Sequence, residues 1–254
     1  MNVAAPRVRS ETRDGGIALV TLDRPRANAI DPQLVAELSD AMSEHAGAPA
    51  IVLTSSQSFF SAGWDLPTVR AFDRREMERF VADFSVLLRR MFALETPLIA
   101  ALPGHAIAGG LILASPADER IVAEGNGEYG LSEVVLGVPI PRPCYEIFRY
   151  ILGDREAERL AAAGDNVSAD RALEIGLVDR IVPAADLLEA ALDRARQLAR
   201  RSRAAYAEIK RRARARTLRR YDRAMENDPF LEFWFSDEAR RRIDALVERL
   251  TKKA

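Results

Sequence analysis

Two glycine-containing segments have the residue types of a backbone site for negative charge. The first is residues 59–66 and the second is residues 104–111, and each follows a short apolar stretch. Glycine permits unusual backbone angles and lets a ligand approach the main chain closely. Main-chain N–H groups at such turns and at helix starts favour negative charge, so one from each segment could together bind an oxyanion. Either segment alone is equally consistent with an ordinary tight turn.

A third segment, residues 128–137, holds a glutamate among apolar side chains. Glu133 stands between Leu131 and the apolar run 134–136. Removal from water disfavours a charged carboxylate, so these neighbours are expected to raise the pKa of Glu133 toward neutrality. A carboxyl group that titrates near neutral pH is suited to removing and returning a proton. The alternative is an exposed glutamate that caps a turn.

Alternating strands and helices are expected to position these segments. Apolar runs predict strands at residues 7–12, 17–22, 50–54, 98–102, 118–123 and 178–182, the first two joined by a hairpin at residues 14–16. Helical periodicity predicts a helix over residues 32–45, capped by Asp31 with Pro32 at its first position, and others over 74–94 and 111–114. Residues 125–143 are rich in Gly and Pro, which predicts mostly loop. This alternation indicates an α/β layer architecture.

The last part of the chain has a different pattern. Helical periodicity dominates from Tyr145 onward, with breaks at Gly153 and Gly164, and residues 184–254 predict only helices. Residues 194–223 contain thirteen basic residues against Glu208 and Asp222. This run leaves a nucleic-acid role open, although a solvated helical face that pairs with acidic neighbours is the simpler interpretation.

The composition excludes several classes of protein. The 254-residue chain is 48% hydrophobic, and its 37 basic and 38 acidic side chains give a net charge of −1. It can therefore form a core, and it offers no overall charge to attract nucleic acid or an anionic membrane. Cys144 is the only cysteine and His45 and His105 the only histidines, so we expect neither a disulfide nor a metal. Without a bilayer-spanning run or a signal peptide, we expect a cytoplasmic protein.

In their order and spacing, these segments resemble the enoyl-CoA hydratase/isomerase (crotonase) superfamily. Residues 22–25 (LDRP) and 28–30 (NAI) are similar to the family's N-R-P-x-x-x-N-A-L loop, and residues 60–66 (FSAGWDL) to its F-x-A-G-x-D-L segment. Residues 104–114 resemble G-x-A-x-G-G-G-x-x-L-A, followed by Asp118. The resemblance continues in residues 133–137 and in residues 172–182 (ALEIGLVDRIV), which are similar to the family's A-x-x-x-G-L-V-D-x-V-V segment. It covers nearly the whole chain.

The resemblance implies a fold, an assembly and a ligand. The fold is α/β, with a crotonase-like spiral of ββα units over residues 1–200 and a C-terminal helical trimerisation region over residues 201–254. The assembly is a homotrimer or a dimer of trimers, without nucleic-acid or membrane partners. The ligand is an acyl-CoA thioester, so no cofactor is expected beyond the coenzyme A of the substrate.

The resemblance also implies the residues of the site. The thioester oxygen would accept hydrogen bonds from the backbone N–H groups of Trp64 and Gly109, each worth roughly 3 kcal/mol in the transition state. Glu133 would be the catalytic acid–base group, and the side chain of Trp64 would shape the acyl pocket. The other residues expected around the substrate and its CoA are Arg24, Ala27, Ala62, Gly63, Asp65, Leu66, Ile112 and Ser132.

One departure from the family pattern decides the expected reaction. Family hydratases hold a water molecule between two glutamates; Glu133 keeps one of these positions, and Ile112 occupies the other. A single glutamate resembles the Δ3,Δ2-enoyl-CoA isomerases, in which one carboxylate removes a proton from C2 and returns it at C4. We therefore expect isomerisation of 3-enoyl-CoA to 2-enoyl-CoA.

Other functions stay open at this stage. Within the same family they are hydration of the fatty-acid β-oxidation type and decarboxylation. A non-catalytic acyl-CoA binding protein is a further alternative, because Trp64 is large and residues 108–110 are one glycine short of the family's triple. We expect the two rare side chains of Cys144 and His105 to be an inert thiol and a structural histidine.

Overall fold

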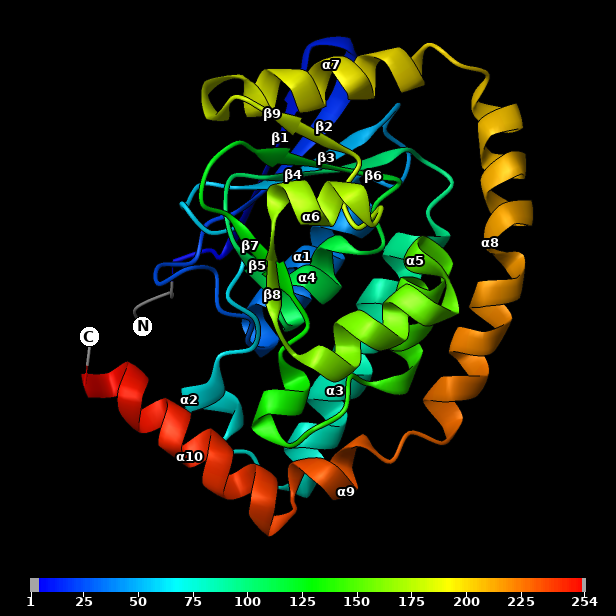
Figure 1. The fold of residues 1–254 in the computed structure, drawn as a ribbon. Coiled ribbons are helices and arrows are strands. Elements are labelled where there is room, and N and C mark those ends of the chain that lie inside the picture. Colours follow the sequence, from blue (N-terminus) through cyan, green and yellow to red (C-terminus); the bar gives the residue numbers. More distant parts are fainter. Residues whose placement is uncertain (1–4, 253–254) are drawn as a thin grey trace.

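The computed structural model describes residues 5–252, in which a large sheet and a small sheet are surrounded by helices (Figure 1). The large sheet has the strand order β1-β2-β3-β4-β6-β9. Its strands are β1 (Val8–Arg13), β2 (Ile17–Leu22), β3 (Ile51–Ser55), β4 (Leu98–Leu102), β6 (Glu119–Ala123) and β9 (Arg180–Val182). β1 and β2 form the predicted antiparallel hairpin through a 3₁₀ turn at Asp14–Gly16, and the other neighbouring strands are parallel. The predicted α/β architecture is confirmed.

The small sheet has the order β5-β7-β8. Its strands are β5 (Ala106–Ile107), β7 (Glu128–Gly130) and β8 (Asn166–Ser168). The prediction that residues 125–143 are mostly loop is therefore wrong in part, since they also include a 3₁₀ turn, Glu133–Leu136, and the start of a helix. Strands of two or three residues are too short to show a periodic pattern, and their pairing with distant segments produces them.

Ten α-helices surround the sheets within residues 5–252. They are α1 (Pro32–Glu44), α2 (Leu66–Val69), α3 (Arg74–Ala93), α4 (Gly109–Ala114), α5 (Arg142–Ala163), α6 (Ala169–Glu174), α7 (Leu187–Ala199), α8 (Arg203–Glu226), α9 (Phe230–Trp234) and α10 (Asp237–Lys252). A third 3₁₀ turn, Ala184–Asp186, precedes α7. The predicted cap of α1 is confirmed, because the Asp31 carboxylate accepts a hydrogen bond from Leu34 N at 2.9 Å. No helix in this part of the chain is both long and apolar enough to cross a membrane.

The two faces of the large sheet carry separate apolar layers. Figure 1 shows α7 across one face, where Leu192 and Ala195 pack with Ile99 and Ile121 of the strands. The opposite face joins the main core with α1, α3, α4 and α5. Parallel strands covered on both faces are expected to be apolar throughout, and β4 is buried along its whole length.

The last three helices wrap around this core. α8 runs along α3 and α5, and α9 and α10 then cross the end of the molecule beside α2 and the 3₁₀ turn that begins at Glu133 (Figure 1). The predicted breaks in α5 are confirmed, because Gly153 (φ +75°) interrupts the helix and Gly164 (φ +70°) ends it. The chain therefore returns to the region that the sequence predicts for the site.

Candidate active site

A cavity of about 1020 Å³ lies between the two glycine-containing loops, α4, the turn of Glu133 and the C-terminal helices. Ten of the eleven residues predicted for the site line it, so distant parts of the sequence converge as expected. These ten are Arg24, Ala27, Ala62, Trp64, Asp65, Leu66, Gly109, Ile112, Ser132 and Glu133. The remaining residue, Gly63, is buried beside the cavity with a φ of +91°.

The backbone N–H groups of Trp64 and Gly109 lie close to each other. A Cβ atom built on Gly109 would lie 3.3 Å from the backbone nitrogen of Trp64, and one built on Gly63 would lie 3.3 Å from the backbone nitrogen of Gly109. Gly109 is the first residue of α4, where an N–H has no acceptor within its own helix. Neither N–H donates to a backbone oxygen within residues 5–252. Both are available to an oxygen atom in the cavity.

Close packing of the two loops sets this geometry. A Cβ atom on Gly110 would lie 2.2 Å from the carbonyl oxygen of Ser61, so only glycine lets α4 approach the first loop this closely. Ala108, just before α4, has a φ of +50° and a ψ of −125°, a conformation that costs a non-glycine residue about 1–3 kcal/mol. Its N–H donates to Gly130 O at 2.8 Å, which ties the strained residue to β7.

Buried polar side chains hold the first loop in place. The Asn28 side chain accepts from Arg24 N at 2.7 Å and donates to Phe60 O at 3.1 Å. The Ser61 hydroxyl donates to Asn28 O at 2.8 Å. The guanidinium of Arg24 forms an ion pair with Asp65. Asn28 was singled out in the sequence only as part of the NAI motif, and its full burial identifies it as a positioning residue.

Glu133 is the first residue of its 3₁₀ turn and is only 8% exposed. Burial raises the pKa of Glu133 to about 7, which confirms the predicted direction. Its Oε2 atom is buried and has no hydrogen-bond partner in the described part of the chain. Among its apolar sequence neighbours, Leu131 is buried, whereas Val134 and Val135 are 44% and 54% exposed and contribute little to the desolvation of Glu133. α5 and α10 also contact the turn that begins at Glu133.

The cavity lining offers few groups for acid–base chemistry. Its carboxyl groups are those of Glu133 and Asp65, and Asp65 is paired with Arg24. Ile112 is buried in α4 and presents an apolar side chain to the cavity. Residues 5–252 contain no group of three side chains suited to holding a metal ion. Glu133 is therefore the carboxyl group of the lining that has no ion-pair partner in the described chain.

Aromatic side chains close one side of the cavity. Trp64 makes edge contacts with Phe80, Phe84, Phe230 and Trp234, with ring centroids 5.1–6.0 Å apart. Phe230 and Trp234 of α9 line the cavity, as do two leucines of α10 that the sequence analysis did not single out. These are Leu246 and Leu250. The two leucines are four residues apart on an amphipathic helix, and this spacing indicates that they share one apolar face.

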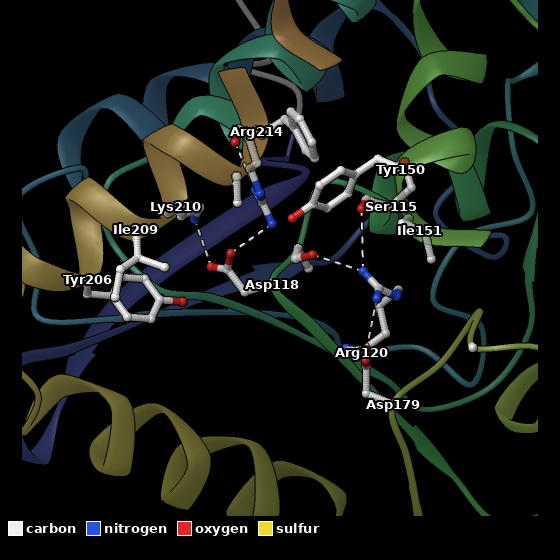
Figure 2. A pocket seen from close by; sticks show the side chains of 14 residues that line it. Ser115, Asp118, Arg120, Tyr150, Ile151, Asp179, Tyr206, Ile209, Lys210 and Arg214 are labelled. Atoms are coloured by element: carbon white, nitrogen blue, oxygen red, sulfur yellow. Dashed lines mark hydrogen bonds and ion pairs between the residues drawn. The ribbon is translucent and has the colours of Figure 1, made fainter. Parts of the chain in front are cut away.

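A second cavity, of about 540 Å³, lies where α8 meets the core and contains the inward-facing part of the basic run (Figure 2). Asp118 binds Lys210 at 2.7 Å and Arg214 at 2.8 Å. Lys210 also donates to Thr96 O, and Arg214 to Phe92 O. Burial lowers the pKa of Lys210 to about 8. The ion pairs and hydrogen bonds of these two cations link α8 to the core, which favours a structural role for this part of the basic run.

The rare side chains of Cys144 and His105 behave as expected. Cys144 is buried in α5, and burial raises the pKa of its thiol, which favours an inert group over a nucleophile. His105 stacks on Phe59 with ring centroids 4.4 Å apart and is a packing residue of the second loop.

Comparison with known proteins gives consistent results across sequence and structure. The family model described as Enoyl-CoA hydratase/isomerase matches residues 12–253. Carnitinyl-CoA dehydratase of Salmonella typhi is 34% identical over 191 residues, which cover 74% of this chain and 72% of that protein.

Two solved structures extend the likeness to the fold. Human mitochondrial Δ3-Δ2-enoyl-CoA isomerase has a TM-score of 0.90 and 26% identity, and the match covers 97% of this chain and 99% of that one. An enoyl-CoA hydratase/isomerase family protein from Pseudomonas syringae has a TM-score of 0.82 and 30% identity, covering 87% of this chain and 95% of that one. The crotonase fold is confirmed.

Proposed function

The chain belongs to the enoyl-CoA hydratase/isomerase family of acyl-CoA enzymes, and from this premise we propose that it isomerises a 3-enoyl-CoA to a 2-enoyl-CoA. One observation carries the proposal: Glu133 is the only carboxyl group of the cavity lining without an ion-pair partner in the described chain. Ile112, at the position of the second hydratase glutamate, offers no group to hold water. The similarity to human Δ3-Δ2-enoyl-CoA isomerase supports the same reaction.

In the proposed mechanism, the backbone N–H groups of Trp64 and Gly109 hold the thioester oxygen. Their hydrogen bonds draw electron density toward that oxygen and make the protons on C2 more acidic. They bind the dienolate more tightly than the thioester, because negative charge accumulates on the oxygen during the reaction. Donors fixed in the backbone need no rearrangement for this purpose, and each is typically worth about 3 kcal/mol.

Glu133 carries the proton in both steps. As a carboxylate it removes a proton from C2 of the 3-enoyl-CoA, and the electrons of the C–H bond move into the dienolate. As a carboxylic acid it then returns the proton to C4, which leaves the double bond between C2 and C3. A pKa of about 7 suits both roles, because the two protonation states are then similar in free energy at neutral pH.

A hydratase or dehydratase reaction is the second candidate. The observation in its favour is the 34% identity to carnitinyl-CoA dehydratase. Hydration requires a group that positions and deprotonates water, and dehydration requires one that protonates the leaving hydroxyl; the cavity lining provides Ile112 where the family places a second glutamate. A non-catalytic acyl-CoA binding protein is the third candidate, and it would use the same oxyanion site without turnover.

The test uses 3-hexenoyl-CoA and crotonyl-CoA as substrates. We expect the purified protein to produce conjugated thioester absorbance from 3-hexenoyl-CoA, and Glu133→Gln to lower kcat by roughly 100- to 10,000-fold, the usual contribution of a general acid–base group. Glu128→Gln, the same change at an exposed position on β7, is the matched control and should retain activity. Faster hydration of crotonyl-CoA than isomerisation of 3-hexenoyl-CoA would favour the second candidate. Tight binding without turnover would favour the third.

A further inference from the structure

The indole ring of Trp64 lies directly over Gly109. A Cβ atom built on Gly109 would lie 2.8 Å from Trp64 Cδ1 and 3.1 Å from Trp64 Nε1, besides 3.3 Å from the Trp64 backbone nitrogen. The pyrrole edge of the ring, which carries the N–H, therefore lies beside Gly109, one of the two residues whose backbone N–H groups form the proposed oxyanion site. Four aromatic rings surround Trp64 and restrict its rotation.

The indole N–H has no acceptor. Nε1 of Trp64 is buried and lacks a hydrogen-bond partner anywhere in the described structure. Buried donors are normally paired, and an unpaired one costs about 1–3 kcal/mol. An acceptor that enters with a ligand would remove this cost.

Standard geometry places such an acceptor nearby. In a helical residue the N–H and the Cα–Cβ bond point to the same side, so an oxygen 2.9 Å from Gly109 N lies about 3.5 Å from the position of a Cβ atom. The indole nitrogen lies 3.1 Å from that same position. The oxygen and the indole nitrogen therefore both lie within about 3.5 Å of one common point, so the indole N–H is a neighbour of an oxygen bound by the backbone of Gly109.

We infer that the indole N–H of Trp64 is a third donor to the thioester oxygen, in addition to the two backbone N–H groups. This inference rests on the proposed thioester site and adds a catalytic role for a side chain. Because the third hydrogen bond strengthens as charge develops on the oxygen, it assists the reaction more than it assists binding. Trp64 would otherwise serve only to fill the acyl pocket.

Nuclear magnetic resonance of the wild-type protein gives a direct test. Trp64 and Trp234 are the only tryptophans, so ¹⁵N-labelled tryptophan gives two indole N–H signals, and Trp64→Phe identifies that of Trp64 by its loss. We expect butanoyl-CoA to move this signal downfield. S-butyl-CoA, a thioether in which a methylene group replaces the carbonyl, should leave it near its position in the free protein.

Trp64→Phe supplies the second readout, because it removes the indole N–H and keeps an aromatic ring. We expect binding of butanoyl-CoA to weaken roughly three- to tenfold and kcat for 3-hexenoyl-CoA to fall roughly ten- to a hundredfold, while the affinity for S-butyl-CoA falls by a smaller factor than that for butanoyl-CoA.

Four results would overturn the inference. Equal shifts of the Trp64 signal with both ligands, or equal losses of affinity for both, would show that the side chain only packs against the acyl group. If butanoyl-CoA binds without moving the signal, the inference fails alone and the proposed function stands. If neither ligand binds to the wild-type protein, the proposed thioester site fails and the inference fails with it.

Discussion

Replacing Glu133 with glutamine should make the folded protein more stable at alkaline pH while it abolishes activity. Burial raises the pKa of Glu133 from 4.5 to about 7, so the folded protein holds this proton more tightly than the unfolded chain does. Between these two values the folded state binds more protons than the unfolded state, and the free energy of unfolding therefore decreases as the pH rises. Above pH 7 the buried carboxylate is ionised, and the full free-energy cost of removing its charge from water lowers the stability of the folded state.

The size of the effect follows from the two pKa values. They differ by about 2.5, and one pKa unit corresponds to about 1.4 kcal/mol, so ionisation of buried Glu133 costs about 3 kcal/mol. Glutamine has nearly the same shape and no charge to desolvate. The advantage of Glu133→Gln over the wild type should therefore be small at pH 5 and should increase by about 2–3 kcal/mol at pH 8.

Chemical denaturation at the two pH values measures this difference. Wild type and Glu133→Gln are compared at one protein concentration, because assembly would otherwise change the apparent stability. Other groups also titrate in this range, but they are common to both proteins and cancel in the difference. Glu124→Gln, the same change at an exposed position just after β6, serves as the control and should show no such dependence on pH. The reasoning would be refuted if the stability difference between wild type and Glu133→Gln were the same at pH 5 and pH 8.

Two further predictions concern the oxyanion site and the docking of α8. Gly109→Ala places a Cβ atom 2.8 Å from the Trp64 ring and should reduce kcat at least a hundredfold. Gly47→Ala adds a Cβ atom in open space and should leave kcat near that of wild type. Similar activities of the two variants would contradict the proposal that the Gly109 N–H binds the thioester oxygen. Asp118→Asn leaves two buried cations without their counter-charge and should lower the free energy of unfolding by about 3–5 kcal/mol. Asp154→Asn at an exposed ion pair is the control and should change it far less, as denaturant unfolding would show; equal losses in the two variants would contradict the structural role of Asp118.

Local signals in the sequence predict much of the fold. The hairpin of β1 and β2, the Asp31 cap of α1 and the Gly153 and Gly164 breaks in α5 all follow from short stretches of chain, and each is confirmed. The same local signals do not predict the small sheet. β5, β7 and β8 are two or three residues long, and they exist only because segments from three parts of the chain pair with one another.

The ordered motifs of the chain determine its family and the lining of its site. Residues that match the family's motifs in type and spacing are expected to occupy the same backbone positions, because the shared fold fixes where each motif lies. Ten of the eleven residues predicted in this way line one cavity. That resemblance does not describe the surroundings of each group. Val134 and Val135, which follow Glu133 in the sequence, are exposed, whereas α5 and α10 contact its turn from distant parts of the chain.

The sequence by itself therefore determined the architecture, the family and the residue that we propose as the acid–base group, because these depend on local periodicity and on motif order. Tertiary structure decided the burial of Glu133, where the indole N–H of Trp64 lies and which cations of the basic run turn inward to Asp118. The physical reason is the same in each case. Burial, close approach and ion pairing depend on segments far apart in the chain, and these meet only in the folded protein.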